Sequence, residues 1–189
     1  MATLMVSISG VRGIVGTSFT PQVVCKYVEA FAAAHPGEHV VLGRDSRVSG
    51  PWVSQLAEAV LLACGKRVTN IGLVATPTVQ LAVLQLRADG GGVVVTSSHN
   101  PVEWNGLKFV APDSLFVAPE VCEAMYRLDR VPRYATAAAH AARDDSWNER
   151  HVASVLALPC MHGVRLDGMR VALDTVCGAG GPGEFESRV

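Results

Sequence analysis

The fold of this chain is decided by the stretch G-V-V-V-T-S-S-H-N-P, residues 92–101. Three consecutive valines without polar alternation predict a central strand that is buried on both faces of a sheet. The polar run that follows ends in Asn100-Pro101, which is a turn signal. We therefore expect a buried strand that opens, at its carboxyl end, into a polar loop.

Further strand-like runs lie on both sides of this stretch. They cover residues 4–8, 39–42, 67–74 and 107–110. Helical patterns that separate them start at Thr20-Pro21, Pro51 and Thr76-Pro77, where proline takes an early helical position. Strands that alternate with helices predict an α/β fold. We expect a mixed, largely parallel sheet with helices on both faces, which is a three-layer α/β/α arrangement.

The last third of the chain repeats this organisation only in part. Residues 129–145 show little periodicity and are predicted to form a loop, whereas residues 146–156 have apolar side chains at helical spacing. A strand is predicted at 169–173, and a Gly-rich loop follows at 177–181. We therefore expect one domain over residues 1–163 and the beginning of a second, truncated α/β domain over residues 164–189.

The composition predicts a folded protein without a large charged surface. Of the 189 residues, 49% are hydrophobic and 17% are charged, and the net charge is −1. This balance supports a packed core and provides no basic field for nucleic acid or for a membrane. The N-terminus lacks the features of a signal peptide, and the five scattered cysteines form no C-x-x-C pair, which is typical of reduced thiols. We expect a cytoplasmic protein that binds neither nucleic acid nor membrane.

Three polar loops are expected at strand ends, where ligands gather in open α/β sheets. They cover residues 9–13, 43–47 and 96–101. A hydroxyl group among cations is what a phosphoryl-transfer site requires, because the transferred group carries several negative charges. The side chains that can supply such a site, one of them on the following strand, are Arg12, Arg44, Asp45, Arg47, Ser97, Ser98, His99 and Lys108.

Each of these side chains also has a purely structural interpretation. Arg12 lies beside glycines and is compatible with a surface turn, and Arg47 is compatible with a solvated charge. Arg44 and Asp45 can pair to brace their own loop. A single histidine such as His99 is more often a hydrogen-bonded structural residue. The hypothesis of a site therefore depends on the convergence of the loops and not on any one residue.

The sequence argues against a serine hydrolase. Ser98 and His99 are adjacent, and neighbouring side chains of an extended segment point to opposite sides, so they are badly placed to form a nucleophile–base pair. The G-x-S-x-G elbow is absent, since Thr96 and Asn100 occupy its glycine positions. The same alternation predicts that only one of Ser97 and Ser98 faces a cleft, and the position of Thr96 favours Ser98.

Several segments resemble the α-D-phosphohexomutases, in the same order along the chain. T-S-S-H-N-P, residues 96–101, resembles the family's phosphoserine loop, in which Ala or Gly is usual at the Ser97 position. S-G-V-R-G-I-V-G, residues 9–16, resembles the family's N-terminal substrate loop. G-R-D-S-R-V-S-G (43–50) and E-W-N-G-L-K-F (103–109) match two further family segments. D-T-V-C-G-A-G-G, residues 174–181, looks less closely like the opening of the family's second domain.

The resemblance implies a phosphoglucosamine, phosphomannose or phosphoglucose mutase. Such an enzyme is an intramolecular phosphotransferase that moves phosphate between the C1 and C6 positions of a hexose or hexosamine phosphate. Phosphorylated Ser98 would donate its phosphoryl group and take back the other phosphate of the resulting sugar bisphosphate, and Mg²⁺ would contact the phosphate on Ser98. Arg12 and Lys108 would bind substrate and take part in proton transfer, with His99 beside the serine. The residues expected to support the loop are Arg44, Asp45 and Asn100.

The chain departs from the family pattern in its C-terminal part. The D-G-D-x-D-R segment that holds the family's metal does not occur in the sequence. The third-domain specificity loop and the fourth-domain phosphate-binding loop are missing as well, so the resemblance implies that the remaining mutase domains are absent from this chain. We expect the isolated 189 residues to be inactive. The alternative is a non-catalytic sugar-phosphate-binding or assembly domain with a relic serine loop.

Overall fold

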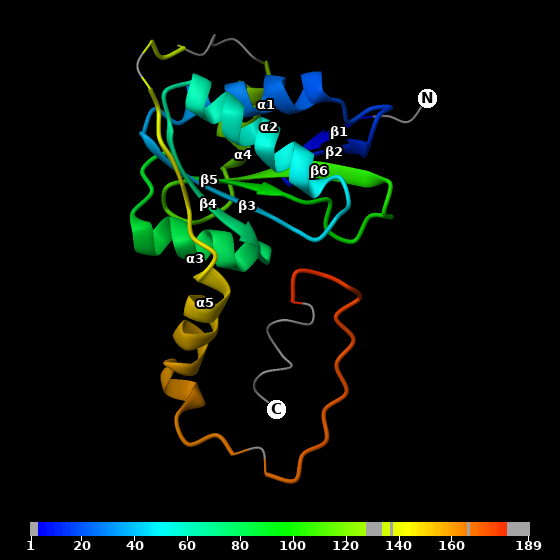
Figure 1. The fold of residues 1–189 in the computed structure, drawn as a ribbon, viewed down its shortest axis with the longest axis vertical. Helices are drawn as coiled ribbons and strands as arrows, with labels where there is room; N and C mark the ends of the chain where they lie inside the picture. The colour runs from blue at the N-terminus through cyan, green and yellow to red at the C-terminus, as the bar shows by residue number, and fades with distance from the viewer. Residues whose placement is uncertain (1–3, 128–133, 137, 166, 181–189) are drawn as a thin grey trace.

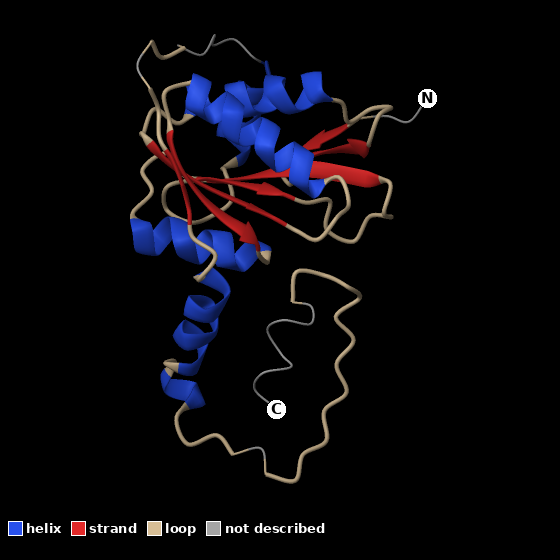
Figure 2. Cartoon of the chain, in the orientation of Figure 1, coloured by secondary structure: helices blue, strands red, loops and turns tan. Residues whose placement is uncertain are grey.

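The computed structural model describes residues 4–127, 134–136, 138–165 and 167–180. Helices cover both faces of a single seven-stranded sheet (Figure 1, Figure 2). Within these described ranges, no helix is both long enough and apolar enough to cross a membrane.

The seven strands form one mixed sheet. Their bounds are Met5–Ser7 (β1), Gly10–Ile14 (β2), His39–Arg44 (β3), Arg67–Leu73 (β4), Gly92–Val95 (β5), Trp104–Val110 (β6) and Ala141–Arg143 (β7). They lie in the spatial order β1-β2-β6-β5-β3-β4-β7. The pairs β3–β4, β3–β5 and β4–β7 are parallel, whereas β1–β2, β2–β6 and β5–β6 are antiparallel. The prediction of a mixed α/β sheet is therefore confirmed, although parallel and antiparallel pairs occur in equal number where a largely parallel sheet was expected.

β5 lies at the centre of the sheet, between β3 and β6. All of its residues, Gly92 to Val95, are buried. The run of valines thus forms the strand predicted from it, with side chains that enter the core on both faces. Its carboxyl end leads directly into residues 96–101, the loop on which the functional prediction depends.

Helices pack on both faces of the sheet. α1 (Pro21–Ala34), α2 (Gly50–Ala63) and α4 (Pro119–Arg127) lie on one face, and α3 (Thr76–Leu86) and the start of α5 (Trp147–Leu156) lie on the other (Figure 1). A short 3₁₀ helix, Pro159–Met161, follows α5. α1, α2 and α3 each carry proline in the first turn, as predicted, because the missing N–H of proline is not needed there. The three-layer arrangement is confirmed.

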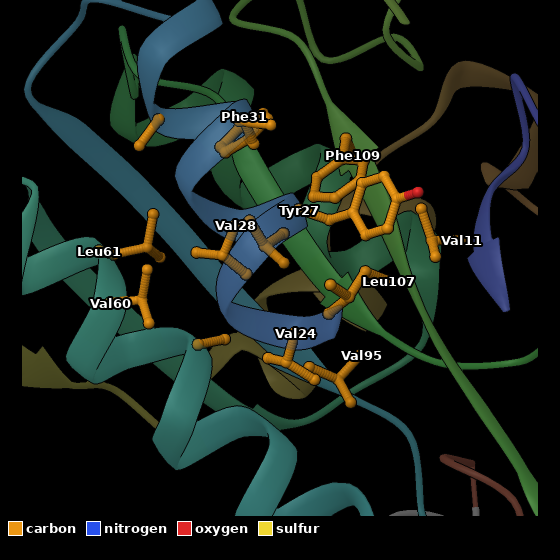
Figure 3. Close-up of a cluster of buried hydrophobic side chains, with 14 of the residues drawn as sticks. Val11, Val24, Tyr27, Val28, Phe31, Val60, Leu61, Val95, Leu107 and Phe109 are labelled. Carbon is orange, nitrogen blue, oxygen red and sulfur yellow. The ribbon is translucent and has the colours of Figure 1, made fainter. Parts of the chain in front are cut away.

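The core has two parts, one on each face of the sheet. On the α1 and α2 face, Val28 and Phe31 pack against the strand residues Leu107 and Phe109, and the Phe31 and Phe109 rings stack at 5.2 Å (Figure 3). On the α3 face, the buried residues are Val41, Ile71, Val74, Val79, Ala82, Val83, Ala88, Val94, Val110 and Trp147. Side chains of adjacent strand residues therefore enter different halves of the core, which fixes the register of the sheet.

The segment 9–13, predicted as a loop, is mostly strand. Ser7 pairs with Gly10 across a tight turn, and β2 continues to Ile14 between β1 and β6. Glycine at position 10 is required because its φ is +110° and a Cβ there would lie 2.2 Å from the Leu107 carbonyl oxygen. The glycines that suggested a loop thus serve the close approach of two strands. Arg12 consequently sits on a strand and not in a turn.

The part of the chain after β6 differs from the prediction in three places. β7 lies within the segment 129–145, and α4 was not predicted. Residues 169–173, predicted as a strand, pair with no strand in the described part of the chain, and Val171 and Leu173 are 74% and 61% exposed. An isolated strand cannot satisfy its backbone groups, so the apolar alternation there has no sheet to join. Residues 129–133 and 181 lie outside the described residues, and the boundary between residues 163 and 164 stays a prediction.

Candidate active site

The loop after β5 separates two adjacent serines. Ser97 is fully buried, and its hydroxyl donates a hydrogen bond to Asn100 Oδ1 at 3.2 Å. Ser98 is exposed and adopts a positive φ of 57°, which is uncommon for a residue other than glycine. The Ser98 N–H donates to the Thr96 hydroxyl oxygen at 3.0 Å. Of the two hydroxyl groups, only that of Ser98 is on an exposed residue.

The loop after β3 braces the serine loop. Arg47 forms an ion pair with Asp45, with 3.2 Å between Nε and Oδ2, and Asp45 Oδ2 also accepts a 2.6 Å hydrogen bond from the Thr96 hydroxyl. The interpretation of Arg47 as a solvated charge is wrong, because its side chain is only 10% exposed. Arg44 does not pair with the Asp45 carboxylate; its Nη1 donates to the Asp45 carbonyl oxygen at 3.0 Å.

A hollow of about 610 Å³ opens beside Ser98. We call it the serine hollow; the predicted site residues that line it are Asp45, Arg47, Ser98, His99 and Asn100. One wall is formed by residues 176–179, which return to the sheet from the C-terminal segment, and the Ser46 hydroxyl donates to the Cys177 carbonyl oxygen at 2.6 Å. The hollow therefore gives the Ser98 side chain open space toward solvent.

A second hollow, of about 300 Å³, contains Arg12 and Lys108, and the predicted residues Arg44 and Ser97 line neither hollow. We call it the cation hollow; it is lined by Ile8, Ser9, Arg12, Lys108, Phe116, Val117, Ala118 and Pro119. The Lys108 Nζ lies 5.5 Å from the centre of the Phe116 ring. Among the described residues, neither Arg12 nor Lys108 forms an ion pair with a carboxylate. The hollow therefore presents two positive charges that a bound anion can neutralise.

The environment of Lys108 shifts the pKa of its ammonium group. Burial lowers the pKa of the Lys108 ammonium, and the positive charge of Arg12 lowers it further, while the negative charge of Asp45 acts in the opposite direction. A lowered pKa makes the Lys108 ammonium group a stronger acid than an ordinary lysine and so eases release of its proton. This property suits Lys108 to the proton-transfer role that the resemblance implies.

The two hollows are adjacent on one face of the sheet. Lys108 pairs in register with Val94, and Val94 belongs to the core under α3, so the Lys108 side chain emerges on the α3 face. Arg12 pairs with Gly106, two residues from Lys108, and shares that face. The Arg12 guanidinium donates to Asn100 Oδ1 at 3.4 Å, which links the cation hollow to the serine loop. Arg12 and Ser98 are therefore close, although each lines a hollow of its own.

The donor set near Ser98 does not by itself fit a magnesium site. Mg²⁺ requires several oxygen ligands in near-octahedral geometry. The carboxylate beside the loop is Asp45, and both of its oxygens already accept hydrogen bonds, Oδ1 from the Arg47 N–H and Oδ2 from Arg47 and Thr96. Within the described ranges, no group of three or more His, Cys, Asp or Glu side chains could hold a metal ion.

Sequence reasoning missed one residue of this region, Phe116, and the contacts of another, Arg47. Arg47 was found among the loop residues, but its acceptors lie 51 to 57 positions away, so no local pattern reveals them. Phe116 lies in a segment without periodicity, and it reaches Lys108 because it forms an isolated β-bridge with Val110. A contact of this kind depends on tertiary structure alone.

Residues 4–128 match the family model described as phosphoglucomutase/phosphomannomutase, alpha/beta/alpha domain I. The chain is 36% identical over 174 residues to a phosphoglucosamine mutase of Synechococcus sp., a match that covers 90% of this chain and 37% of that relative. It is 39% identical over 116 residues to a phosphoglucomutase/phosphomannomutase of Thermococcus kodakarensis, covering 59% of this chain and 25% of that protein.

A solved structure has the same fold. The crystal structure of a phosphoglucomutase/phosphomannomutase family protein from Burkholderia thailandensis superposes with a TM-score of 0.66 at 28% identity, covering 80% of this chain and 36% of that one. The chain thus spans between about a quarter and two fifths of the length of the curated relatives it matches.

Proposed function

This chain belongs to the phosphoglucomutase/phosphomannomutase family, and on that premise we propose that it is the phosphate-carrying part of a phosphohexomutase, with Ser98 as the carrier. The proposed reaction is the transfer of phosphate between C1 and C6 of a hexose or hexosamine phosphate. The names of the relatives, phosphoglucosamine mutase and phosphoglucomutase/phosphomannomutase, support this substrate class and leave the individual sugar open. A cytoplasmic location is part of the same proposal.

One observation carries the choice of Ser98. At the end of the central strand, two hydroxyls are available, and Ser97 is fully buried whereas Ser98 is exposed and lines the serine hollow. A phosphoryl group with its negative charges needs space and solvation, which only the Ser98 position offers. His99 lines the same hollow and is in reach to assist beside the serine.

The proposed step conserves the phosphoryl group. The bond between phosphorus and Ser98 Oγ breaks as a bond to the sugar hydroxyl oxygen forms, and the hydroxyl proton passes to a base. After the sugar bisphosphate reorients, its other phosphate returns to Ser98 Oγ, and the oxygen it leaves regains a proton. The position of Lys108, with its lowered pKa, supports a role as the proton-transfer group, and the charge of Arg12 supports stabilisation of the transferred group.

In this proposal, Mg²⁺ would bind this part of the chain only through the phosphate on Ser98. Phosphorylation of Ser98 would add phosphate oxygens, which are ligands that Mg²⁺ favours, and the ion would supply charge stabilisation there. The other ligands would have to come from outside the described residues, because Asp45 is already engaged by Arg47 and Thr96. The steps above therefore rest on the side chains of this chain.

Mutase turnover tests the proposal. In the longest natural protein that contains this sequence, Ser98→Ala should reduce turnover of hexose and hexosamine phosphates by several orders of magnitude. Ser97→Ala is the matched control and should keep most activity, because its hydroxyl is buried and contacts Asn100. A Ser98→Ala protein that retained turnover within tenfold of wild type would refute the assignment.

A further inference from the structure

The backbone of Ser98 is held in a conformation that serine seldom adopts. Its φ of 57° lies in the left-handed region, which is populated mainly by glycine, asparagine and aspartate. A residue stays in this region only where surrounding interactions determine it. The contacts that do so at Ser98 lie on both sides of the residue.

A closed ring of hydrogen bonds surrounds the Ser98 main chain. On one side, the Ser98 N–H donates to the Thr96 hydroxyl at 3.0 Å, and that hydroxyl donates to Asp45 Oδ2 at 2.6 Å. On the other side, the Ser98 carbonyl oxygen accepts from Arg47 Nη2 at 2.9 Å, and Arg47 Nε donates to the same Asp45 oxygen at 3.2 Å. The backbone N–H and the carbonyl oxygen of Ser98 are thus both linked to the Asp45 carboxylate, the first through Thr96 and the second through Arg47.

Arg47 uses every N–H of its guanidinium group in this arrangement. Nε binds Asp45, Nη1 donates to the carbonyl oxygens of Pro101 (2.7 Å) and Trp104 (2.8 Å), and Nη2 donates to those of Ser98 (2.9 Å) and Asn100 (2.7 Å). The planar fork of arginine offers five donors in fixed directions, whereas lysine offers three on a flexible stem. The Arg47 and Asp45 side chains are only 10% and 19% exposed.

We propose that the Asp45–Arg47 pair is a clamp that sets the backbone of Ser98 and so directs its hydroxyl into the serine hollow, with Arg47 as a positioning residue; the catalytic meaning of this clamp rests on the proposed function. All four of the carbonyl groups that Arg47 binds belong to residues 98–104. Three of them, on Ser98, Asn100 and Pro101, belong to the serine loop, and the fourth, on Trp104, is at the start of β6, where the chain leaves that loop.

Nuclear magnetic resonance on the 189-residue chain tests the geometry without any assay of activity. An intraresidue contact between HN and Hα gives a strong nuclear Overhauser effect at positive φ and a weak one at negative φ. Wild type should show the strong effect at Ser98. Arg47→Gln should lose it, and Arg47→Lys should keep part of it, while the amide signals of β4 and α3 stay in place.

Arg127→Gln is the matched control, since Arg127 is 70% exposed and pairs with Glu123 on the surface of α4. It should leave the Ser98 signal unchanged. If Arg47→Gln and Arg47→Lys both kept the strong effect at Ser98 in a folded chain, the clamp would be disproved. That result would not touch the assignment of Ser98 as the carrier.

Phosphorylation kinetics supply the functional readout. In the longest natural protein that contains this sequence, Arg47→Gln should lower the rate of Ser98 phosphorylation by hexose 1,6-bisphosphate about ten- to a hundredfold, because a misplacement of about 1 Å can cost a hundredfold. The KM should change little, since Arg12 and Lys108 line the other hollow. An unchanged rate in Arg47→Gln with normal labelling of wild type would contradict the clamp, whereas no labelling of Ser98 in wild type would contradict the proposed function instead.

Discussion

Ser97 and Ser98 are neighbours in sequence but occupy opposite environments, since Ser97 is fully buried with its hydroxyl on Asn100 and Ser98 is exposed in the serine hollow. The separation follows from the end of β5, where alternate residues face opposite sides and the positive φ of Ser98 then turns the chain. The sequence alone ranked these serines by motif and by alternation. The structure adds burial as a physical reason for the difference.

Loss of the Ser97 hydroxyl should have a small effect on stability. Ser97→Ala removes one buried hydrogen bond to Asn100, and a typical intramolecular hydrogen bond contributes about 1 kcal/mol. The free energy of unfolding in urea should therefore fall by about 1 kcal/mol. A loss several times larger would mean that Ser97 organises the loop, and the clamp of Asp45 and Arg47 would not suffice.

The positive charge of Arg12 should have a measurable effect on the pKa of Lys108. Because Arg12 lowers the pKa of Lys108, Arg12→Gln should raise that pKa toward its ordinary value of 10.5. Reductive ¹³C-methylation of the lysines, followed by a pH titration, reports the pKa of each ammonium group. Lys26, which is exposed on α1, provides the internal reference. A Lys108 pKa that did not move, or that fell, would show that the two cations do not share the cation hollow.

The lowered pKa of Lys108 also predicts the direction in which the stability of the chain changes with pH. Since the pKa of Lys108 is lower in the folded chain than in the unfolded chain, the unfolded state binds more protons between the two values. The contribution of Lys108 to the free energy of unfolding therefore rises as the pH increases from the pKa of the folded chain toward 10.5. Lys108→Met should remove this rise, so the unfolding free energies of mutant and wild type should converge with increasing pH.

Trp147 should anchor α5 to the α3 face of the sheet. Its side chain is fully buried with Val79 and Val83 of α3 in the same core, and substitution of a buried tryptophan by alanine costs about 3–5 kcal/mol. Trp147→Ala should lower the free energy of unfolding by that amount. Trp147→Phe should cost much less, because phenylalanine keeps a large aromatic side chain in the same buried space. Equal losses in both variants would contradict this packing.

Local sequence signals predicted the centre of the fold well. β5 and the prolines that open α1, α2 and α3 were found because a buried strand and a helix start depend on neighbouring residues. β2 and β7 were missed because each exists through pairing with a distant strand, β6 in one case and β4 in the other. The glycines of β2 suggested a turn, although Gly10 permits contact with Leu107.

At the candidate site, too, some features could be predicted from the sequence and others depend on tertiary structure. Arg12, Asp45, Ser98, His99 and Lys108 were predicted because their residue types suit phosphoryl chemistry, and the structure places Arg12 and Lys108 within β2 and β6 and the other three in loops that follow β3 and β5. The structural contribution of Arg47 could not be found, since its acceptors lie at residues 98–104 and become neighbours only when β3 and β5 pair. Residue chemistry is thus readable from sequence, but the bonds that orient it depend on the sheet.

The position of the phosphate on the chain decides whether Ser98 is the phosphate carrier. The longest natural protein that contains this sequence should be exposed to hexose 1,6-bisphosphate, digested with trypsin and analysed by fragmentation mass spectrometry. Cleavage after Arg87 and Lys108 releases a peptide that contains Thr96, Ser97, Ser98 and His99. We expect one phosphate, on Ser98, which disappears in Ser98→Ala and persists in Ser97→Ala. Phosphate on Ser97, or labelling that survives Ser98→Ala, would contradict this expectation.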